Sequence, residues 1–144
     1  MRHFRRLDYG YTVVELLIVV TIVGIMMSIA IPRVALLLDR IAVDSAASDV
    51  QASLSLARSL ALAGGAPVAV EVDSLSGVVR IRRGEERLQS RNVGQAHQVK
   101  LVPTRDSLTY DSRGLGRGAA NLSIVIRRGA AAETVFISRL GRVR

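Results

Sequence analysis

The pattern of apolar and polar residues divides the chain into two kinds of structure. Between Val13 and Ile31, every residue except Glu15 is apolar or small. As a helix that rises about 1.5 Å per residue, this run spans roughly 28 Å, close to the bilayer hydrocarbon thickness of about 30 Å. The pattern therefore predicts a membrane-spanning helix over residues 13–31.

The helical period continues after the apolar run. From Leu36 to Ala61, apolar residues recur at intervals close to the helical repeat, and charged residues fall between them. Pro32 is a candidate position for a kink, because proline removes one internal hydrogen bond. Gly64 and Gly65 predict the end of the helix. We expect one long helix within residues 11–65, whose second half presents an apolar stripe to a sheet.

After Gly65 the period changes from helical to alternating. In residues 67–73, the three valines Val68, Val70 and Val72 alternate with Ala69, Glu71 and Asp73, which predicts a half-buried strand. Strands are predicted at residues 67–73, 78–82, 98–102, 107–110, 121–127 and 134–138. The fold class is therefore α+β: a long N-terminal helix packed by its C-terminal half on an antiparallel β-sheet or small β-sandwich.

Glu15 is the one charged residue in the apolar run. An acidic side chain at the centre of a bilayer costs about 2.5–3.5 kcal/mol on insertion scales and less near the interface. Glu15 lies near one end of the run, so its carboxylate could reach the headgroups. The alternative is a cationic partner inside the membrane. The run contains no Lys, Arg or His, and the nearest cation would be the α-amino group created by cleavage just before Tyr11.

Three arginines precede the apolar run, at positions 2, 5 and 6. By the positive-inside rule, they keep the N-terminus in the cytoplasm and direct the following domain outward. A secretory signal peptide is the competing interpretation, but its apolar region is only about 7–15 residues long and ends in a small-residue cleavage site. The longer run here, followed by Pro32 and Arg33, favours a retained anchor.

Residues 10–16 read GYTVVEL, which resembles the class III signal of type IV prepilins and type II secretion pseudopilins. The resemblance implies that prepilin peptidase cleaves after Gly10 and that Tyr11 becomes N-methylated. It also implies that Glu15 pairs with the N-terminal amine of a neighbouring subunit in a filament. Such pairing offsets the free-energy cost of the buried charge, because burying a well-paired ion can cost almost nothing whereas burying an unpaired one is costly.

The C-terminal half resembles a branch of these proteins. YDSRG at 110–114, the strand at 122–126 and VFISRLGRVR at 135–144 are similar to the GspH/FimT family of minor pseudopilins. The resemblance implies a leader at 1–10, a helix at 11–65 and an exported β-rich domain at 66–144. It further implies a single-pass protein of the bacterial inner membrane with a periplasmic domain, which assembles with major and minor pseudopilins into a filament.

Catalytic chemistry is not apparent in the sequence. Cysteine is absent and the only two histidines are His3 and His97, with His97 expected in a polar loop. Glu85 and Glu86 are adjacent on an expected surface turn, and no spacing typical of a metal site occurs. Catalytic triad, phosphate-loop and dinucleotide patterns are also missing. We therefore predict a protein that is not an enzyme and carries neither a metal nor a cofactor.

The exported half is strongly basic. The whole chain has a formal net charge of +8, and from Ala66 onward it carries 14 basic and seven acidic residues. The candidate binding residues are Arg113, Arg117, Arg127, Arg128, Arg139, Arg142 and Arg144. One interpretation is a structural subunit of a type II secretion pseudopilus or a type IV pilus-like tip, with these arginines solvated or facing partner subunits. The alternative is a minor pilin that binds double-stranded DNA through phosphate contacts during uptake for natural transformation.

Overall fold

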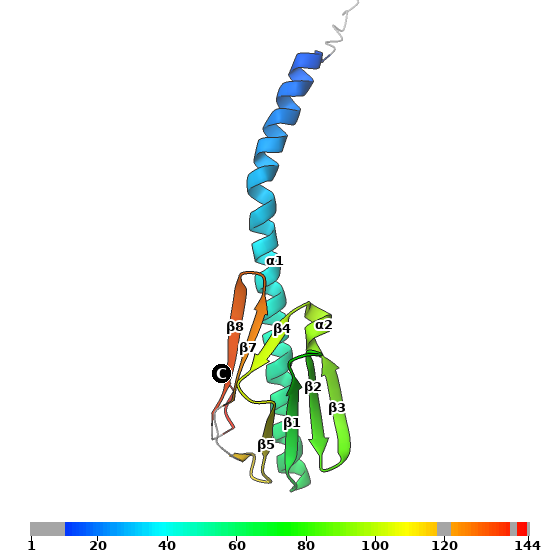
Figure 1. Cartoon of the computed structure of the whole chain (residues 1–144), viewed down its shortest axis with the longest axis vertical. Helices are drawn as coiled ribbons and strands as arrows, with labels where there is room; N and C mark the ends of the chain where they lie inside the picture. The colour runs from blue at the N-terminus through cyan, green and yellow to red at the C-terminus, as the bar shows by residue number, and fades with distance from the viewer. Residues whose placement is uncertain (1–10, 118–121, 139–140, 144) are drawn as a thin grey trace, which may run out of the picture. The chain divides into compact units, whose positions relative to one another are not determined.

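The structure, a computed structural model, describes residues 11–117, 122–138 and 141–143 (Figure 1). The chain order is a long helix, three strands, a short helix and five further strands. The elements are α1 (Val13–Gly64), β1 (Val68–Asp73), β2 (Val78–Arg83), β3 (Glu86–Asn92), α2 (Val93–His97), β4 (Lys100–Pro103), β5 (Ser107–Tyr110), β6 (Gly116–Arg117), β7 (Leu122–Arg128) and β8 (Ala131–Ile137). By compactness they form two units, residues 1–35 and 36–144.

In the first unit, the described part of the chain is the N-terminal portion of α1. Every residue from Tyr11 to Ala35 is exposed, and α1 contains an apolar window of mean hydropathy 2.6 with none of it buried. The helix continues through Pro32 without interruption. By length and composition, this is a helix able to cross a membrane.

The second half of α1 carries a stripe of buried, mostly small side chains. The buried residues are Val43, Ala46, Ala47, Val50, Ser53, Leu54, Ala57 and Ala61. The buried hydroxyl of Ser53 donates to the carbonyl of Asp49 at 2.9 Å, so this buried polar group has a hydrogen-bond partner. The helix ends at Gly64, and Gly65 has a φ of 57°, a left-handed conformation that glycine adopts without steric cost.

The strands form two antiparallel sheets. The first has the order β3-β2-β1-β5-β6, and the second has the order β4-β7-β8. In β1 and β2 the residues alternate between buried and half-buried, as period two requires. Their register pairs Val70 with Ile81 and Val72 with Val79, which directs these four apolar side chains to the same face.

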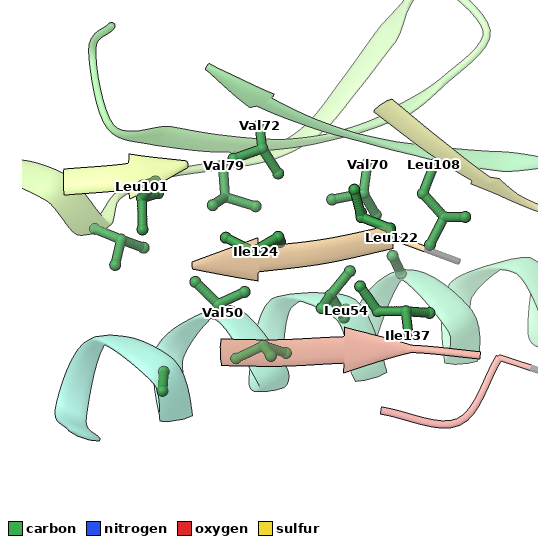
Figure 2. Close-up of a cluster of buried hydrophobic side chains, with 14 of the residues drawn as sticks. Val50, Leu54, Val70, Val72, Val79, Leu101, Leu108, Leu122, Ile124 and Ile137 are labelled. Carbon is green, nitrogen blue, oxygen red and sulfur yellow. The ribbon is translucent and has the colours of Figure 1, made fainter. Parts of the chain in front are cut away.

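The core lies between α1 and the inner faces of both sheets (Figure 2). Val50 and Leu54 of the helix point toward Ile124 and Leu122 of β7, with Val70 of β1 beyond them. Each of these side chains is at most 2% exposed. Burial of apolar surface at about 25 cal/mol per Å² makes this cluster the main source of stability for the domain.

Helix α2 is held by a close approach of two glycines. Gly77, in the turn after β1, has a φ of 67°, and a β-carbon there would lie 2.6 Å from the α-carbon of Gly94. The amide of Gly94 donates to the carbonyl of Gly77 at 2.9 Å. Asn92 is the N-cap of the helix, and its side-chain oxygen accepts from the amide of Gln95 at 3.0 Å. Only glycine fits this contact at both positions.

The predicted α+β class is confirmed, and each of the six predicted strands corresponds to a strand of the structure. The sequence interpretation missed β3, α2 and β6. His97 was expected in a loop but is the last residue of α2, and Glu86 was expected in a turn but begins β3. Strand β3 was missed because Leu88 is its one apolar residue, so it lacks the alternation that identifies the others.

Candidate functional site

The start of α1 is organised by Thr12. Its side-chain oxygen accepts from the amide of Glu15 at 3.2 Å, and its carbonyl accepts from the amide of Leu16 at 3.1 Å. Thr12 and Glu15 have the spacing of a capping box, which satisfies amides that the first turn of a helix leaves free. This signal was present in the sequence and was missed there. Gly10, the predicted cleavage residue, lies outside the described residues.

Glu15 is exposed in the first turn of α1, where the helix dipole favours a negative charge. The described helix contains no cation from Val13 to Ile31. Tyr11, just ahead of the helix, is 80% exposed. This end of the chain therefore presents a carboxylate for which the described part of the chain offers no opposite charge within the apolar run.

The loop that holds Arg113 is organised by Asp111. The Asp111 carboxylate accepts from the amides of Arg113 and Leu115, each at 2.9 Å. These bonds hold the pKa of Asp111 below its usual value, and the bond from Leu115 lowers it most. The guanidinium of Arg113 lies 3.4 Å from the same carboxylate, but its side chain stays 79% exposed. Arg113 is thus available for contact in spite of its pairing.

Arg58 of α1 joins this loop to the C-terminal segment. Its Nε donates to the carbonyl of Gly114 at 3.1 Å, and its Nη1 donates to the carbonyl of Gly141 at 3.2 Å. Both glycines have positive φ, and a β-carbon on Gly141 would lie 2.5 Å from the Gly114 carbonyl. The ring of Tyr110 is fully buried beside them. No sequence signal identified Arg58, because a single arginine on a polar helix face is unremarkable.

The predicted arginines fall into separate groups. Arg142 and Arg113 are exposed on the two segments that Arg58 joins, and Arg117 is exposed on β6 nearby in the chain. A shallow groove of about 500 Å³ lies between Arg142 and α1. Arg127 is exposed on β7, in the other sheet. Arg139 and Arg144 lie outside the described residues.

Arg128 has a structural role. Its Nε lies 3.0 Å from a carboxylate oxygen of Asp39, and its Nη1 donates to the carbonyl of His97 at 2.9 Å. Both charged side chains are less than one-third exposed. The side chain therefore connects β7 to α1 and α2, and it contributes little to any free basic surface.

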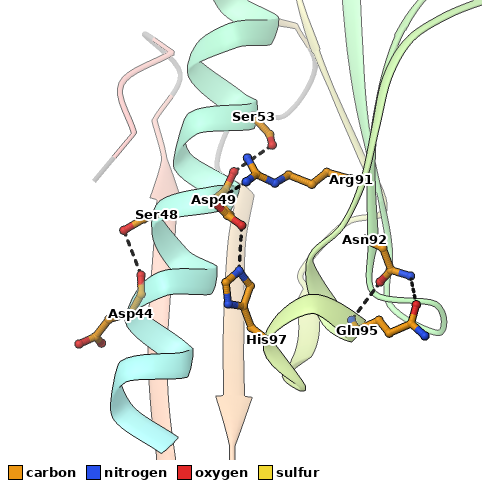
Figure 3. A network of polar contacts seen from close by, with 8 residues as sticks. All are labelled: Asp44, Ser48, Asp49, Ser53, Arg91, Asn92, Gln95 and His97. Atoms are coloured by element: carbon orange, nitrogen blue, oxygen red, sulfur yellow. Dashed lines mark hydrogen bonds and ion pairs between the residues drawn. The ribbon is translucent and has the colours of Figure 1, made fainter. Parts of the chain in front are cut away.

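A second polar network surrounds Asp49 (Figure 3). Arg91 of β3 and His97 of α2 both point toward this carboxylate, at 3.0 and 2.8 Å. Asp49 thereby connects α1 to β3 and α2, two of the three elements that the sequence interpretation missed. Among the residues that the structure describes, no group of three or more His, Cys, Asp or Glu side chains could hold a metal ion.

A long N-terminal helix packed on antiparallel sheets is the fold of pilin-like proteins. The minor pilin FimU of Pseudomonas aeruginosa matches with a TM-score of 0.61 and 19% identity, over 71% of this chain and 86% of FimU. The minor pseudopilin EpsH of Vibrio cholerae matches with a TM-score of 0.58 and 14% identity, over 71% and 94% of the two chains. At these identities, the two structures establish the fold.

Sequence comparison narrows the class. The prokaryotic N-terminal methylation motif matches residues 5–31. The pilin-like protein PilA1 of Thermus thermophilus is 29% identical, over 94% of this chain and 96% of the relative. The chain belongs to the GspH family, described as type II transport protein GspH, which matches residues 46–141. It is thus a minor pilin or pseudopilin of the type IV pilus or type II secretion type, a class of structural subunits.

Proposed function

We propose that this protein is a minor pseudopilin, a structural subunit of a type II secretion pseudopilus or a type IV pilus-like tip. Prepilin peptidase cleaves it after Gly10, and Tyr11 is then N-methylated. The apolar helix anchors it in the inner membrane with its N-terminus in the cytoplasm and its β-rich domain in the periplasm. It acts by assembly with other major and minor pseudopilins and needs no cofactor.

The observation that carries this proposal is the position of Glu15. Its carboxylate is exposed in the first turn of an apolar helix that carries no other charge up to Ile31. Cleavage after Gly10 would put a cationic α-amino group four residues ahead of it, in a neighbouring subunit as well as in its own. Pairing between subunits removes the cost of the charge in lipid, so a correctly placed neighbour is favoured over any other arrangement.

The test follows the full-length chain in its own cell. We expect Glu15→Ala to be cleaved like the wild type, by the mass of its N-terminal peptide, but to be depleted from sheared filaments and from complexes with other pilin subunits. Glu85→Ala, which removes a fully exposed acid of the β-rich domain, is the matched control. Normal incorporation of Glu15→Ala would contradict the role of this carboxylate, and failure of the wild type to enter any filament would contradict the proposed function.

DNA binding is a second candidate, supported by the Arg58 contacts. They bring the segments of Arg142 and Arg113 together with both side chains exposed. Contacts of these arginines with phosphates would be independent of sequence and sensitive to salt.

We would titrate the detergent-solubilised processed chain with labelled double-stranded DNA at several salt concentrations. An Arg113→Ala/Arg142→Ala variant should lose affinity and show a shallower salt dependence. The control is Arg80→Ala/Arg82→Ala, which removes arginines already paired with carboxylates. Equal loss in both variants would indicate general charge attraction, and no binding at low salt would exclude this second candidate.

A further inference from the structure

The outer face of the β4-β7-β8 sheet carries an unusual combination of residues, and it is called here the β7 face. The strands alternate, so the residues between the buried positions point away from the core. The β7 face consists of Lys100, Val102, Ser123, Val125, Arg127, Ala132, Thr134 and Phe136. The three strands lie side by side in Figure 1.

Two cations lie directly opposite one another on this face. Lys100 of β4 is the register partner of Arg127 of β7, and both side chains are exposed. Like charges at directly opposed positions of neighbouring strands destabilise a sheet. The outer face of the other sheet is arranged differently, because Arg80 lies 3.5 Å from Asp73 and Arg82 lies 3.2 Å from Glu71.

Within the part of the chain that the structure describes, this pair has no counter-charge on the β7 face. None of the described residues of the face is acidic. Glu133, the acidic residue of β8, is the register partner of Ile126 and faces the core side. Burial there, together with the hydrogen bond and charge of Asp44 on α1, raises the pKa of Glu133. Arg128, which follows Arg127 in the chain, is already paired with Asp39.

Exposed apolar side chains share this face with the cations: Val102 lies next to the pair, and Phe136 lies farther along β8, four residues from Ala132, the register partner of Arg127. Val102 is 51% exposed and Phe136 is 57% exposed, and the half-buried Val125 lies between their strands. Val125 is the register partner of Val102, one step along the face from the Lys100–Arg127 pair. Apolar and aromatic groups beside unpaired charge are typical of protein–protein interfaces, where aromatic and arginine side chains provide most of the binding energy.

We propose that the β7 face binds a segment of a neighbouring protein subunit in the filament. The segment presents carboxylates to Lys100 and Arg127 and apolar side chains to Val102 and Phe136. The apolar half of the face favours a polypeptide over DNA, whose phosphates would gain nothing from Phe136. This inference deepens the proposed function and rests on it, because it names the surface through which the β-rich domain meets its neighbour.

The first test measures two effects of one substitution in the full chain, on stability and on association with partner subunits, and the proposal predicts opposite signs for them. Arg127→Glu replaces a repulsive pair with an attractive one, so we expect the unfolding midpoint of the detergent-solubilised chain to rise. The same change should reduce association with partner subunits about tenfold or more, because it sets like charges against each other in the complex. Arg127→Lys is the matched control and should change neither quantity much. A drop in both stability and association would indicate a structural role for Arg127 and overturn the proposal.

The second test identifies the occupant. A photo-cross-linking residue is placed at Val102 or Phe136 in the cell, and at Arg87 on the exposed edge of the other sheet as control. We expect cross-links from the first two positions to one protein segment that combines Asp or Glu with apolar residues. Replacing those acids with arginine should restore association of the Arg127→Glu variant.

Each other result overturns the proposal. Cross-links to nucleic acid would make the β7 face a DNA surface, and a segment without acids or without charge-swap rescue would remove its basis. Absence of cross-links in a wild-type chain that still enters filaments would overturn this inference and leave the proposed function standing. If the wild-type chain enters no filament, the proposed function fails first, and the Glu15 experiment reports that separately.

Discussion

The two halves of α1 differ in how their apolar side chains are buried. Apart from Glu15 and Arg33, residues 13–35 carry no charge and present apolar side chains on all sides of the helix, and each of them is exposed. Residues 43–61 bury only one stripe, and that stripe is rich in alanine. Small residues let the helix backbone approach the sheets closely, so the apolar stripe of the second half is buried within the chain itself. None of the described residues of the first half is buried, which is the pattern expected of a helix surrounded by lipid or by neighbouring subunits.

This difference suggests that different regions of α1 determine the stability of the domain and the assembly of the protein. The residues around Leu54 determine whether the domain folds. The described side chains around Glu15 are all exposed, so substitutions of Glu15 and its apolar neighbours are expected to act on insertion and assembly. Matched substitutions in the two regions test this separation directly.

The largest effect is expected from a core leucine. Leu54→Ala leaves a cavity at a fully buried position and should lower the free energy of unfolding by about 2–5 kcal/mol. Leu17→Ala removes a side chain that is 60% exposed and should change it by no more than about 0.5 kcal/mol. Urea unfolding of the detergent-solubilised full chain, followed by circular dichroism, measures both. Equal effects would mean that the first half of α1 also has an internal core.

A pair of glycines should show the next largest contrast. Gly141→Ala forces a β-carbon against the Gly114 carbonyl at a φ of 70°, and should cost about 2–4 kcal/mol. Gly24 has open space around it in a helical conformation. Gly24→Ala should therefore leave the domain unchanged and favour the helix by about 0.5–1 kcal/mol. The same unfolding measurement decides, and a tolerated alanine at position 141 would exclude the tight contact between the C-terminal segment and the YDSRG loop.

Two arginines, one in the β-rich domain and one in the first half of α1, are expected to show a smaller difference in the free energy of unfolding. Arg128→Ala removes the ion pair with Asp39 and the hydrogen bond to His97, and should cost about 1–2 kcal/mol. Arg33→Ala removes an exposed charge from the first half of α1 and should change the free energy of unfolding by less than about 0.5 kcal/mol. If high salt abolished the Arg128 effect, the pair would be a screened surface contact instead of a link between elements.

The smallest effect at neutral pH is expected for two tyrosines. The buried hydroxyl of Tyr110 has no hydrogen-bond partner among the residues that the structure describes. Tyr110→Phe should therefore be neutral or slightly stabilising. Tyr11→Phe, at an exposed position, is the control.

The contrast between the tyrosines should grow at high pH. Burial raises the pKa of Tyr110 to about 12 from an ordinary value of 10.0. Between these values the folded state holds a proton that the unfolded state has lost, so stability falls as pH rises through this window. Tyr110→Phe should reduce this loss, while Tyr11→Phe retains it. Unfolding midpoints measured across the window would contradict the burial of Tyr110 if the two variants behaved alike.

Much of the fold was predictable from the sequence because it depends on near neighbours. The alternation of Val68, Val70 and Val72 predicted β1, and the glycines after Ala63 predicted the end of α1. Strand β3 was not predictable from its residues, because only Leu88 among them is apolar and the strand is specified by its pairing with β2. Helix α2 has only five residues and depends on the contact between Gly94 and Gly77.

The candidate site divides in the same way. The motif from Gly10 to Glu15 is local, and the family match to residues 5–31 is consistent with it. The arginines looked equivalent in the sequence, since all are basic residues of one region. The structure separates Arg128, which is paired, from Arg127, which is exposed beside Lys100.

The sequence by itself determined the helix, its apolar half, the α+β class and the pilin-type N-terminus, because each is encoded in periodicity or in a short continuous motif. Only the tertiary structure decided which charges are free. Arg58 contacts Gly114 and Gly141, which lie 56 and 83 positions away in the chain. Whether a guanidinium meets a carbonyl, a carboxylate or water depends on such distant contacts, and these form only when the two sheets close over α1.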